Sequence, residues 1–172
     1  MEIPEGVQVN VDGFVINVKG PKGEVKRSLA SRKVSFDVKG NTVVFTSDRP
    51  TKREKKLLLT FVAHLRNMIK GVTQGHRYEL KICSGHFPMS VASRNNQFIV
   101  KNFLGEKVSR VLDVKEGAEV KVEGDLVSIE SVDIEKAGQV AADIEHLTRI
   151  NNRDIRIFQD GIYIVKKPRD IA

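Results

Sequence analysis

Residue types that commonly bind metals or attack substrates are sparse in this sequence, which contains one cysteine and four histidines. Cys83 and His86 have the spacing of half a zinc site, but a structural zinc site needs four ligands and the remaining histidines are scattered. A thiol next to an imidazole in a linker is the better interpretation. A lone cysteine also excludes an intramolecular disulfide, which favours a reducing compartment. We therefore expect no metal ion and no other cofactor.

No stretch of the sequence has the pattern of a nucleophile or of a phosphate-binding loop. A G-x-S-x-G elbow is absent, and no Cys-His pair has an orienting carboxylate at a supporting distance along the chain. The stretch GPKGEVK at Gly20 lacks the G-K-[ST] ending of a P-loop and joins two expected strands, so we expect a turn there. An enzyme with a small-molecule substrate is the least favoured class.

The charge of the chain indicates which class of partner it binds. The formal net charge is +7 and the sequence pI is about 9.6, so the molecule is attracted to polyanions. Charge is also sorted: residues 113–145 hold 3 basic and 10 acidic side chains, 84–112 hold 4 and 1, and 149–172 hold 6 and 3. This is either scatter over solvated faces or a sign that two basic segments converge on one surface. The sorting favours convergence.

The strongest candidate for binding is the segment Thr148–Pro168, TRINNRDIRIFQDGIYIVKKP. If Asp160 and Gly161 form a two-residue turn, the residues on either side pair as a β-hairpin. Four isoleucines, at 155, 157, 162 and 164, would then share one face over a helix, and the cations would gather at the open end. The donors at that end, Arg149, Asn151, Asn152 and Arg153, suit phosphate and ribose contacts. An ordinary solvated rim explains these residues equally well.

The strands and helices that would position this segment follow a pattern that is repeated once along the sequence. VSFDVKGNTVVFTSDRPTKREKK, from Val34, matches AEVKVEGDLVSIESVDIEKAG, from Ala118, and aligns Gly40-Asn41 with Gly124-Asp125. Each copy reads as a strand, a two-residue glycine turn, a second strand and a helix. The match continues upstream and downstream, so a duplicated module of about 80 residues is predicted.

Each module is expected to contain one helix. In the first, Thr51 and Glu54 form a possible capping box, followed by apolar residues at helical spacing as far as Gly71. The second helix starts at Asp133. A helix that buries one stripe against a mainly antiparallel sheet gives an α+β fold, here two tandem homologous modules with one helix on one face of each sheet. We place the modules at residues 1–82 and 83–172, with a strand at 77–82 closing the first.

Gly138 lies inside the second predicted helix, where glycine costs about 1 kcal/mol relative to alanine. Something must therefore approach the helix closely at this position. Packing against the sheet or another domain is the favoured explanation. Contact with a nucleic-acid backbone is the alternative, although Asp133 and Glu135 in the first turn would repel a phosphate.

These motifs also resemble a known family. RINNRDIRIFQDGIYIVKK resembles the carboxy-terminal signature of the large-ribosomal-subunit protein six family in its archaeal and eukaryotic branch, where the eukaryotic member is called protein nine. The matching residues are Arg153, Arg156, Phe158, Asp160, Gly161, Ile162, Tyr163, Ile164 and Lys167. SGHFP at Ser84, DIEKAGQVAADIE at Asp133 and the twofold repeat extend the resemblance over essentially the whole chain.

The resemblance implies a cytoplasmic, structural protein of the large ribosomal subunit, without catalytic activity. It implies that the carboxy-terminal domain is the main binder of large-subunit rRNA, near the sarcin-ricin loop and the base of the stalk, beside other ribosomal proteins. The RNA-binding residues it points to are Arg149, Asn151, Asn152, Arg153, Arg156, Lys166 and Lys167. The preceding basic block adds Lys101, Asn102, Lys107 and Arg110.

A second class of function stays open beside this one. Phe158, Tyr163 and the acidic residues 113–145 would form a surface for a protein partner, with no direct RNA contact and with incidental cations. Membrane association is not expected, because the longest apolar run is a few residues, far below the roughly 20 that a bilayer helix needs.

Overall fold

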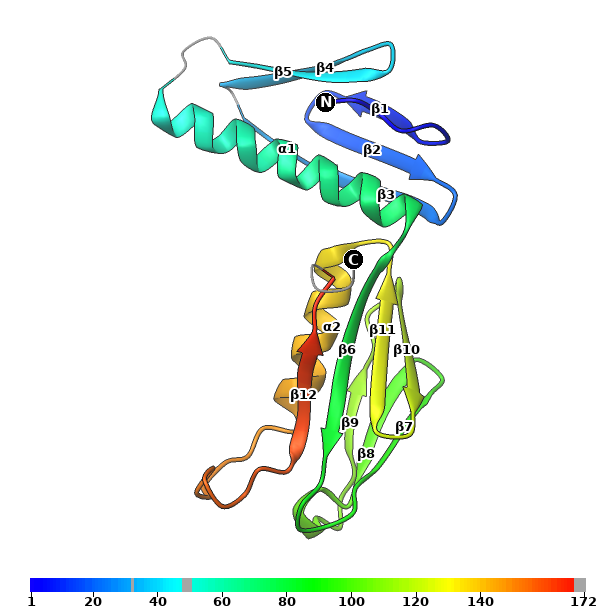
Figure 1. The fold of residues 1–172 in the computed structure, drawn as a ribbon, viewed down its shortest axis with the longest axis vertical. Coiled ribbons are helices and arrows are strands. Elements are labelled where there is room, and N and C mark those ends of the chain that lie inside the picture. The colour runs from blue at the N-terminus through cyan, green and yellow to red at the C-terminus, as the bar shows by residue number, and fades with distance from the viewer. Residues whose placement is uncertain (32, 48–50, 169–172) are drawn as a thin grey trace. The chain divides into compact units, whose positions relative to one another are not determined.

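The computed structural model describes residues 1–31, 33–47 and 51–168. The chain divides into two compact units, Met1–Gly75 and His76–Ala172 (Figure 1). The described residues of unit 1 form five strands and one helix: β1 (Gln8–Asp12), β2 (Val15–Gly20), β3 (Gly23–Ser28), β4 (Val34–Lys39), β5 (Thr42–Ser47) and α1 (Lys52–Thr73). The strands form a three-stranded sheet, β1-β2-β3, and the hairpin β4-β5, all antiparallel.

The core of unit 1 lies between α1 and its strands. Phe61, Leu65 and Val72 follow one another at helical spacing on α1, and all are buried. They face strand residues such as Ile16 and Val18, which have no exposed surface. The helix starts where the sequence predicts, but the Thr51 side chain makes no cap hydrogen bond.

As far as residue 168, unit 2 contains seven strands and one α-helix. These are β6 (His76–Cys83), β7 (Ser90–Arg94), β8 (Gln97–Lys101), β9 (Arg110–Asp113), β10 (Ala118–Glu123), β11 (Leu126–Ser131), α2 (Ile134–Leu147) and β12 (Gly161–Lys166). A short 3-10 turn, Phe103–Gly105, follows β8. The strands form an antiparallel four-stranded sheet, β10-β11-β6-β12, and a three-stranded sheet, β7-β8-β9. Two modules of antiparallel strands with one helix each confirm the predicted fold class.

The strand expected to close the first module belongs to the second. β6 pairs with β11 on one side, where Leu80 lies opposite Val127, and with β12 on the other, where Leu80 lies opposite Ile164. The two compact units consequently meet at Gly75 and His76 and not at residues 82 and 83. The physical reason is that alternate side chains of β6, including the fully buried Leu80, complete the core under α2.

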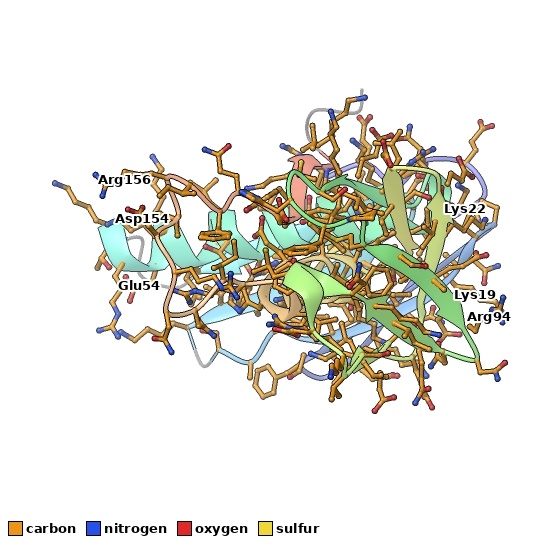
Figure 2. The ribbon with its side chains drawn as sticks, turned by 90° about the horizontal axis from the view of Figure 1, so that it is seen from below. Lys19, Lys22, Glu54, Arg94, Asp154 and Arg156 are labelled. Carbon is orange, nitrogen blue, oxygen red and sulfur yellow. The ribbon has the colours of Figure 1, made fainter. Side chains whose placement is uncertain are left out.

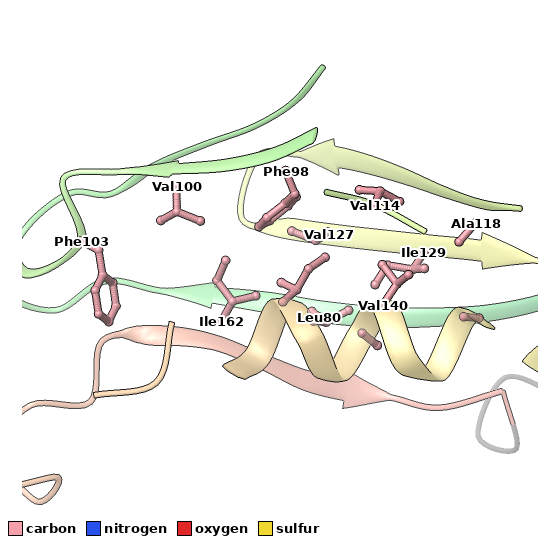
Figure 3. Packing of buried hydrophobic residues seen from close by; sticks show 13 residues of the cluster. Leu80, Phe98, Val100, Phe103, Val114, Ala118, Val127, Ile129, Val140 and Ile162 are labelled. Carbon is pink, nitrogen blue, oxygen red and sulfur yellow. The ribbon is translucent and has the colours of Figure 1, made fainter. Parts of the chain in front are cut away.

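The core of unit 2 collects side chains from every layer of the unit. Figure 3 shows Leu80, Val127 and Ile129 from the four-stranded sheet facing Val140 on α2, with Phe98 and Val100 from β8 above them. All six are at most 1% exposed. Burial of this apolar surface is the main stabilising contribution to the unit. It fixes α2 and the two central strands, β11 and β6. Because β12 pairs with β6, both ends of the segment that joins α2 to β12 are held by this core.

Gly138 is explained by close packing of α2 on β6. A Cβ atom at this position would lie 2.9 Å from the Tyr78 hydroxyl oxygen and 3.4 Å from Cζ of the same ring. Only glycine lets the Tyr78 side chain lie this close to the helix. The packing explanation is therefore confirmed, and the contact involves the sheet.

Candidate nucleic-acid interface

The predicted hairpin at the carboxy-terminal end is wrong. β12 starts at Gly161 and pairs with β6, and residues 148–160 form an irregular loop instead of a strand. Ile155 and Ile157 are 71% and 63% exposed, whereas Ile162 is fully buried. One edge of β6 pairs with β11, and the other edge is free to pair with β12. Because β12 pairs there, the residues before Gly161 have no strand partner. Figure 1 shows the loop at the end of unit 2 where β6 ends and β12 begins.

The outer edge of β12 is covered by side chains from α2 and the residue after its last turn. The Ile162 N–H donates to Thr148 Oγ1 at 2.9 Å, and the Ile164 N–H donates to Glu145 Oε1 at 3.2 Å. Edge strands need such partners, because free N–H groups invite pairing with another chain. The same contacts hold β12 in place beside the loop.

The loop presents the cations and amides that the sequence suggested. Its exposed donors are Arg149, Asn151, Asn152, Arg153 and Arg156. Asn152 has a φ of +58°, in the left-handed region. The Asp154 carboxylate then accepts from the Arg156 N–H at 2.9 Å, and its main-chain oxygen accepts from the Phe158 N–H at 2.9 Å. These bonds give the loop a defined turn.

Arg156 forms an ion pair with Asp154 at the tip of this turn (Figure 2). The Arg156 Nη2 atom lies 2.8 Å from Asp154 Oδ2, and the arginine side chain is 87% exposed. The hydrogen bond from this guanidinium lowers the pKa of Asp154. Such exposed pairs contribute little to stability because water screens them, so a phosphate can compete for the arginine at little cost.

The loop is anchored by Asp160, which is 1% exposed. Its Oδ1 atom accepts from the Gly85 N–H at 2.6 Å, and its Oδ2 atom accepts from the His86 N–H at 3.2 Å. Burial raises the pKa of Asp160, but hydrogen bonds from the Gly85 and His86 N–H groups outweigh it and leave the pKa below its ordinary value. The residue is therefore an ionised anchor between two stretches that are far apart in the sequence.

The glycine after the anchor is crowded by an aromatic ring. A Cβ atom on Gly161 would lie 3.0 Å from the Tyr163 ring. The Tyr163 hydroxyl donates to the main-chain oxygen of Gln159 at 3.2 Å, which holds the ring over the glycine. Asp160, Gly161 and Tyr163 thus form one local unit that ends the loop and starts β12.

An aromatic stack runs from the anchor to the exposed surface. The rings of His86 and Phe158 have centroids 4.9 Å apart, and the Arg153 guanidinium carbon lies 4.8 Å from the Phe158 centroid. Cations over aromatic faces are stabilised by about 0.5–1 kcal/mol at exposed sites. The stack therefore orients Arg153, which is itself exposed.

The earlier basic segment reaches the same end of unit 2 through Arg110. Its Nη1 atom donates to the main-chain oxygens of Leu147 at 2.6 Å and Arg149 at 3.4 Å. Its guanidinium also binds the Glu106 carboxylate at 2.6 and 2.9 Å and lies 4.3 Å from the Phe103 ring centroid. Arg110 therefore ties the segment to the end of α2, and its role in this geometry is to position the loop.

A carboxylate in the earlier basic segment interacts with charges from both basic segments. The pKa of Glu106 is lowered, first by the hydrogen bond from Arg110 and further by the nearby charge of Arg153. Lys101, Asn102 and Lys107 in the same segment are exposed. The Asn102 side-chain amide donates to the Pro88 main-chain oxygen at 3.0 Å.

Lys166 and Lys167 lie apart from the loop cations. Gly161 and Lys166 are the first and last residues of β12, so they lie about 17 Å apart along the strand. Lys166 lies opposite Glu79 after a bulge and forms an ion pair with it at 3.1 Å. The hairpin had predicted these lysines beside Arg153, and this expectation is corrected by the pairing of β12 with β6.

Other kinds of site find little support in the part of the chain that the structure describes. Within residues 1–31, 33–47 and 51–168, no group of three or more His, Cys, Asp or Glu side chains has a geometry suited to a metal ion. His86 contacts Asp160 and Phe158, and Cys83 borders the same region. No helix in the described ranges has the length and apolar character needed to span a membrane.

Comparison with known proteins decides the family. The family model of ribosomal protein L6 matches residues 3–75 and again residues 87–161, which together make up most of the chain. The chain belongs to the ribosomal protein L6 family. The two matched segments confirm the internal duplication, since one family pattern covers each of them. Members of the L6 family are structural ribosomal proteins and not enzymes, which agrees with the expectation from the sequence.

Curated relatives extend this similarity to nearly the full length. The chain is 44% identical over 168 residues to the large ribosomal subunit protein uL6 of Aeropyrum pernix, covering 97% of this chain and 92% of the relative. It is 41% identical over 168 residues to uL6 of Haloarcula marismortui, covering 98% and 94%. The uL6 protein of Desulfurococcus amylolyticus is 44% identical over 170 residues, covering 97% and 92%.

The structure gives two L6-like motifs of this chain a shared role that sequence reasoning missed. SGHFP supplies the N–H groups of Gly85 and His86, and the D-G pair of the carboxy-terminal motif supplies the carboxylate that accepts from them. The stack of His86 on Phe158 and the cover that Glu145 and Thr148 give to β12 were also missed. The available signal was that both motifs carry the family resemblance although Gly85 and Asp160 are 75 residues apart.

Proposed function

We propose that this protein is a structural constituent of the large ribosomal subunit in the cytoplasm and binds large-subunit rRNA chiefly through unit 2. Membership of the L6 family and full-length similarity to large-subunit proteins support the assignment to that particle. The proposed contact surface is the loop of residues 149–156 together with Lys101, Asn102 and Lys107. Arg110 acts as a positioning residue behind this surface.

One observation supports this surface more than any other. The guanidinium of Arg110 joins the segment of residues 101–110 to the main chain of Leu147 and Arg149, so two basic segments distant in sequence are tied together. Arg149, Arg153 and Arg156 then face outward on a loop anchored by a buried carboxylate. Exposed cations on a fixed frame are suited to the phosphate backbone, which positions a protein without reading sequence.

The finer location is part of the same proposal. The family resemblance supports a position near the sarcin-ricin loop at the stalk base, with other ribosomal proteins as neighbours. Lys166 and Lys167 are kept as a secondary contact, because β12 places them at the far end of the strand and Lys166 already pairs with Glu79.

The salt dependence of RNA binding tests the proposal. The association constant K falls as the salt concentration rises. Removing one cation that neutralises a phosphate should reduce the steepness of log K against log salt by about 0.7–0.9. We expect Arg153→Ala combined with Arg156→Ala to lower the slope by that amount per arginine, without unfolding unit 2. The matched control, Lys166→Ala combined with Lys167→Ala, should lower it less. An affinity for rRNA fragments that does not change with salt would contradict the proposal.

A protein-interaction surface is the second candidate, and the exposed apolar side chains of the loop favour it. Ile155 is 71% exposed and Ile157 is 63% exposed, which is unusual for isoleucine. Pull-down from lysate before and after ribonuclease treatment separates the two candidates. Partners that persist after the RNA has been removed, with no bound rRNA before treatment, would support the protein-interaction surface.

A further inference from the structure

The anchored loop borders a pocket that the proposed phosphate contacts do not use. The pocket has a volume of about 580 Å³, within the range of sites for small organic groups. It opens between the turn after β6, the end of the loop and the start of β12. Its walls include Cys83, Ser84, His86, Ile157, Gln159 and Tyr163.

The apolar wall of this pocket is partly fixed and partly exposed. Tyr163 is 42% exposed, but its ring is held against Gly161 and its hydroxyl donates to the Gln159 main-chain oxygen. Ile157 lines the pocket and is 63% exposed. A flat group in the pocket would cover apolar surface of these two side chains.

The polar side of the pocket is suited to the edge of a planar heterocycle. The Gln159 side chain is exposed, and the one contact found for its amide in the described residues is a 3.5 Å approach to the Arg156 main-chain oxygen. A glutamine amide offers both donors and an acceptor. The Asp160 oxygens already accept from the Gly85 and His86 N–H groups, so this carboxylate is occupied by donors of the protein itself.

The charges beside the pocket indicate what kind of planar group would enter. Arg153 lies over Phe158, and the Arg156 side chain is 87% exposed, so two guanidinium groups flank the loop end. A flat ring linked to phosphates matches an apolar wall, an amide and neighbouring arginines. Proteins commonly recognise unpaired RNA bases with this combination of stacking and edge contacts.

We propose that the pocket takes one unpaired nucleobase of the bound RNA, while Arg153 and Arg156 contact the adjoining phosphates. This inference rests on the proposed rRNA-binding function and adds a requirement for a base that is not in a helix. It makes the loop a reader of RNA shape and not only a cationic surface.

Three RNA hairpins of the same length test the pocket with the full-length protein. The first carries one extrahelical nucleotide, the second carries an abasic nucleotide at that position, and the third is fully paired. We expect the first to bind about tenfold more tightly than the second, because base stacking is lost while the phosphate is kept. A fluorescent base analogue at the extrahelical position should change its emission on binding.

Two neighbouring isoleucines give a matched pair of variants. Ile157→Ala, and separately Gln159→Ala, should reduce the preference for the extrahelical base to about none. Ile155→Ala should keep the preference, because Ile155 is more exposed than Ile157 and does not line the pocket. Arg153→Ala should weaken binding to all three hairpins alike.

The outcomes separate the pocket from the proposed function. Equal, salt-dependent binding of all three hairpins by the unaltered protein would overturn the nucleobase pocket and leave RNA binding in place. Binding to none of them would overturn the nucleobase pocket, and an absence of rRNA from the pull-down would overturn the proposed function. If Ile157→Ala abolished a ribonuclease-resistant protein contact and left RNA binding unchanged, the occupant would be a protein and the inference would be wrong.

Discussion

The two units share a strand-turn-strand-helix pattern but differ in the segment after the helix. After α1, which has 22 residues, the chain passes through Gln74 and Gly75 directly into β6. After α2, which has 14 residues, the chain forms the loop of residues 148–160 before it enters β12. The hairpin β4-β5 stays two-stranded, whereas its counterpart β10-β11 is extended by β6 and β12.

This difference separates the scaffold that both units share from the surface that is specific to unit 2. The repeated part supplies a helix and a hairpin in both units. The anchor at Asp160, the stack on Phe158 and the exposed arginines all lie on segments that flank the strand-turn-strand-helix part of unit 2, residues 118–147. If this interpretation is correct, changes to the flanking segments should affect unit 2 and RNA binding, and changes to unit 1 should affect neither.

The largest effect on stability is expected from Asp160→Ala. The N–H groups of Gly85 and His86 would lose their charged acceptor, and a hydrogen bond to a charged group contributes about 1.5–3 kcal/mol. Because both residues are exposed, water replaces part of this loss, and we expect unit 2 to lose about 2 kcal/mol. Both tyrosines of the chain, Tyr78 and Tyr163, lie in unit 2, so tyrosine fluorescence during urea unfolding reports on this unit. An unchanged midpoint would show that the anchor is unimportant.

The same anchor gives a pH dependence with a defined sign. The pKa of Asp160 is lowered in the folded protein from its ordinary value of 3.8. Its contribution to stability is therefore fully present above about pH 4–5 and is lost as the pH falls through the folded pKa. The stability difference between the unaltered protein and Asp160→Asn should shrink as the pH falls from about 5 through the folded pKa. A difference that grows toward low pH would contradict the assignment of an ionised anchor.

A smaller effect is expected where α2 packs on β6. Gly138→Ala gains about 1 kcal/mol in helix propensity, but crowding in a packed core typically costs about 1–3 kcal/mol. The net result should be a loss of about 1 kcal/mol, since the new Cβ lies 2.9 Å from the Tyr78 hydroxyl. Adding Tyr78→Phe removes that oxygen and should restore part of the loss in a double-mutant cycle. Strict additivity of the two substitutions would mean that they do not interact.

The smallest effect is expected at the start of α1. Lys52 and Arg53 lie in the first turn of this helix, where the positive end of the helix dipole disfavours cations by about 0.3–1 kcal/mol each. Replacing both with glutamine should stabilise unit 1 slightly, as measured by hydrogen exchange of α1 amides. The salt slope of RNA binding should stay the same. If the glutamine variant reduced the salt dependence of RNA binding as much as the Arg153 and Arg156 variant does, the proposal that unit 2 is the main RNA-binding unit would be contradicted.

Sequence reasoning predicted the repeated part of the fold well, because periodicity and turn residues are local signals. Gly40-Asn41 and Gly124-Asp125 connect strands as expected, and both helices begin next to the expected residues. It failed at β6 and β12, because strand partners are chosen by tertiary packing. The local pattern of Ile155 and Ile157 is compatible with a hairpin. Instead, the pairing of β12 with β6 buries Ile162 and leaves Ile155 and Ile157 exposed to solvent.

The candidate site shows the same division. The loop cations could be named from charge and from the family signature, and the structure places Arg149, Arg153 and Arg156 on one exposed loop. The role of Arg110 as a tie between segments could not be predicted, because it depends on carbonyl groups 37 and 39 residues away. The grouping of Lys166 with the arginines failed together with the hairpin.

The most direct test of the central claim, that the loop of unit 2 faces rRNA, is crosslinking in intact large subunits. A photoreactive amino acid at position 155 would replace a side chain that is 71% exposed, and the same group at Leu59 of α1, 55% exposed, provides a control in unit 1. We predict that position 155 crosslinks to large-subunit rRNA and that ribonuclease trims the product. Crosslinks from position 155 to protein alone, or none at all in the assembled particle, would contradict the account.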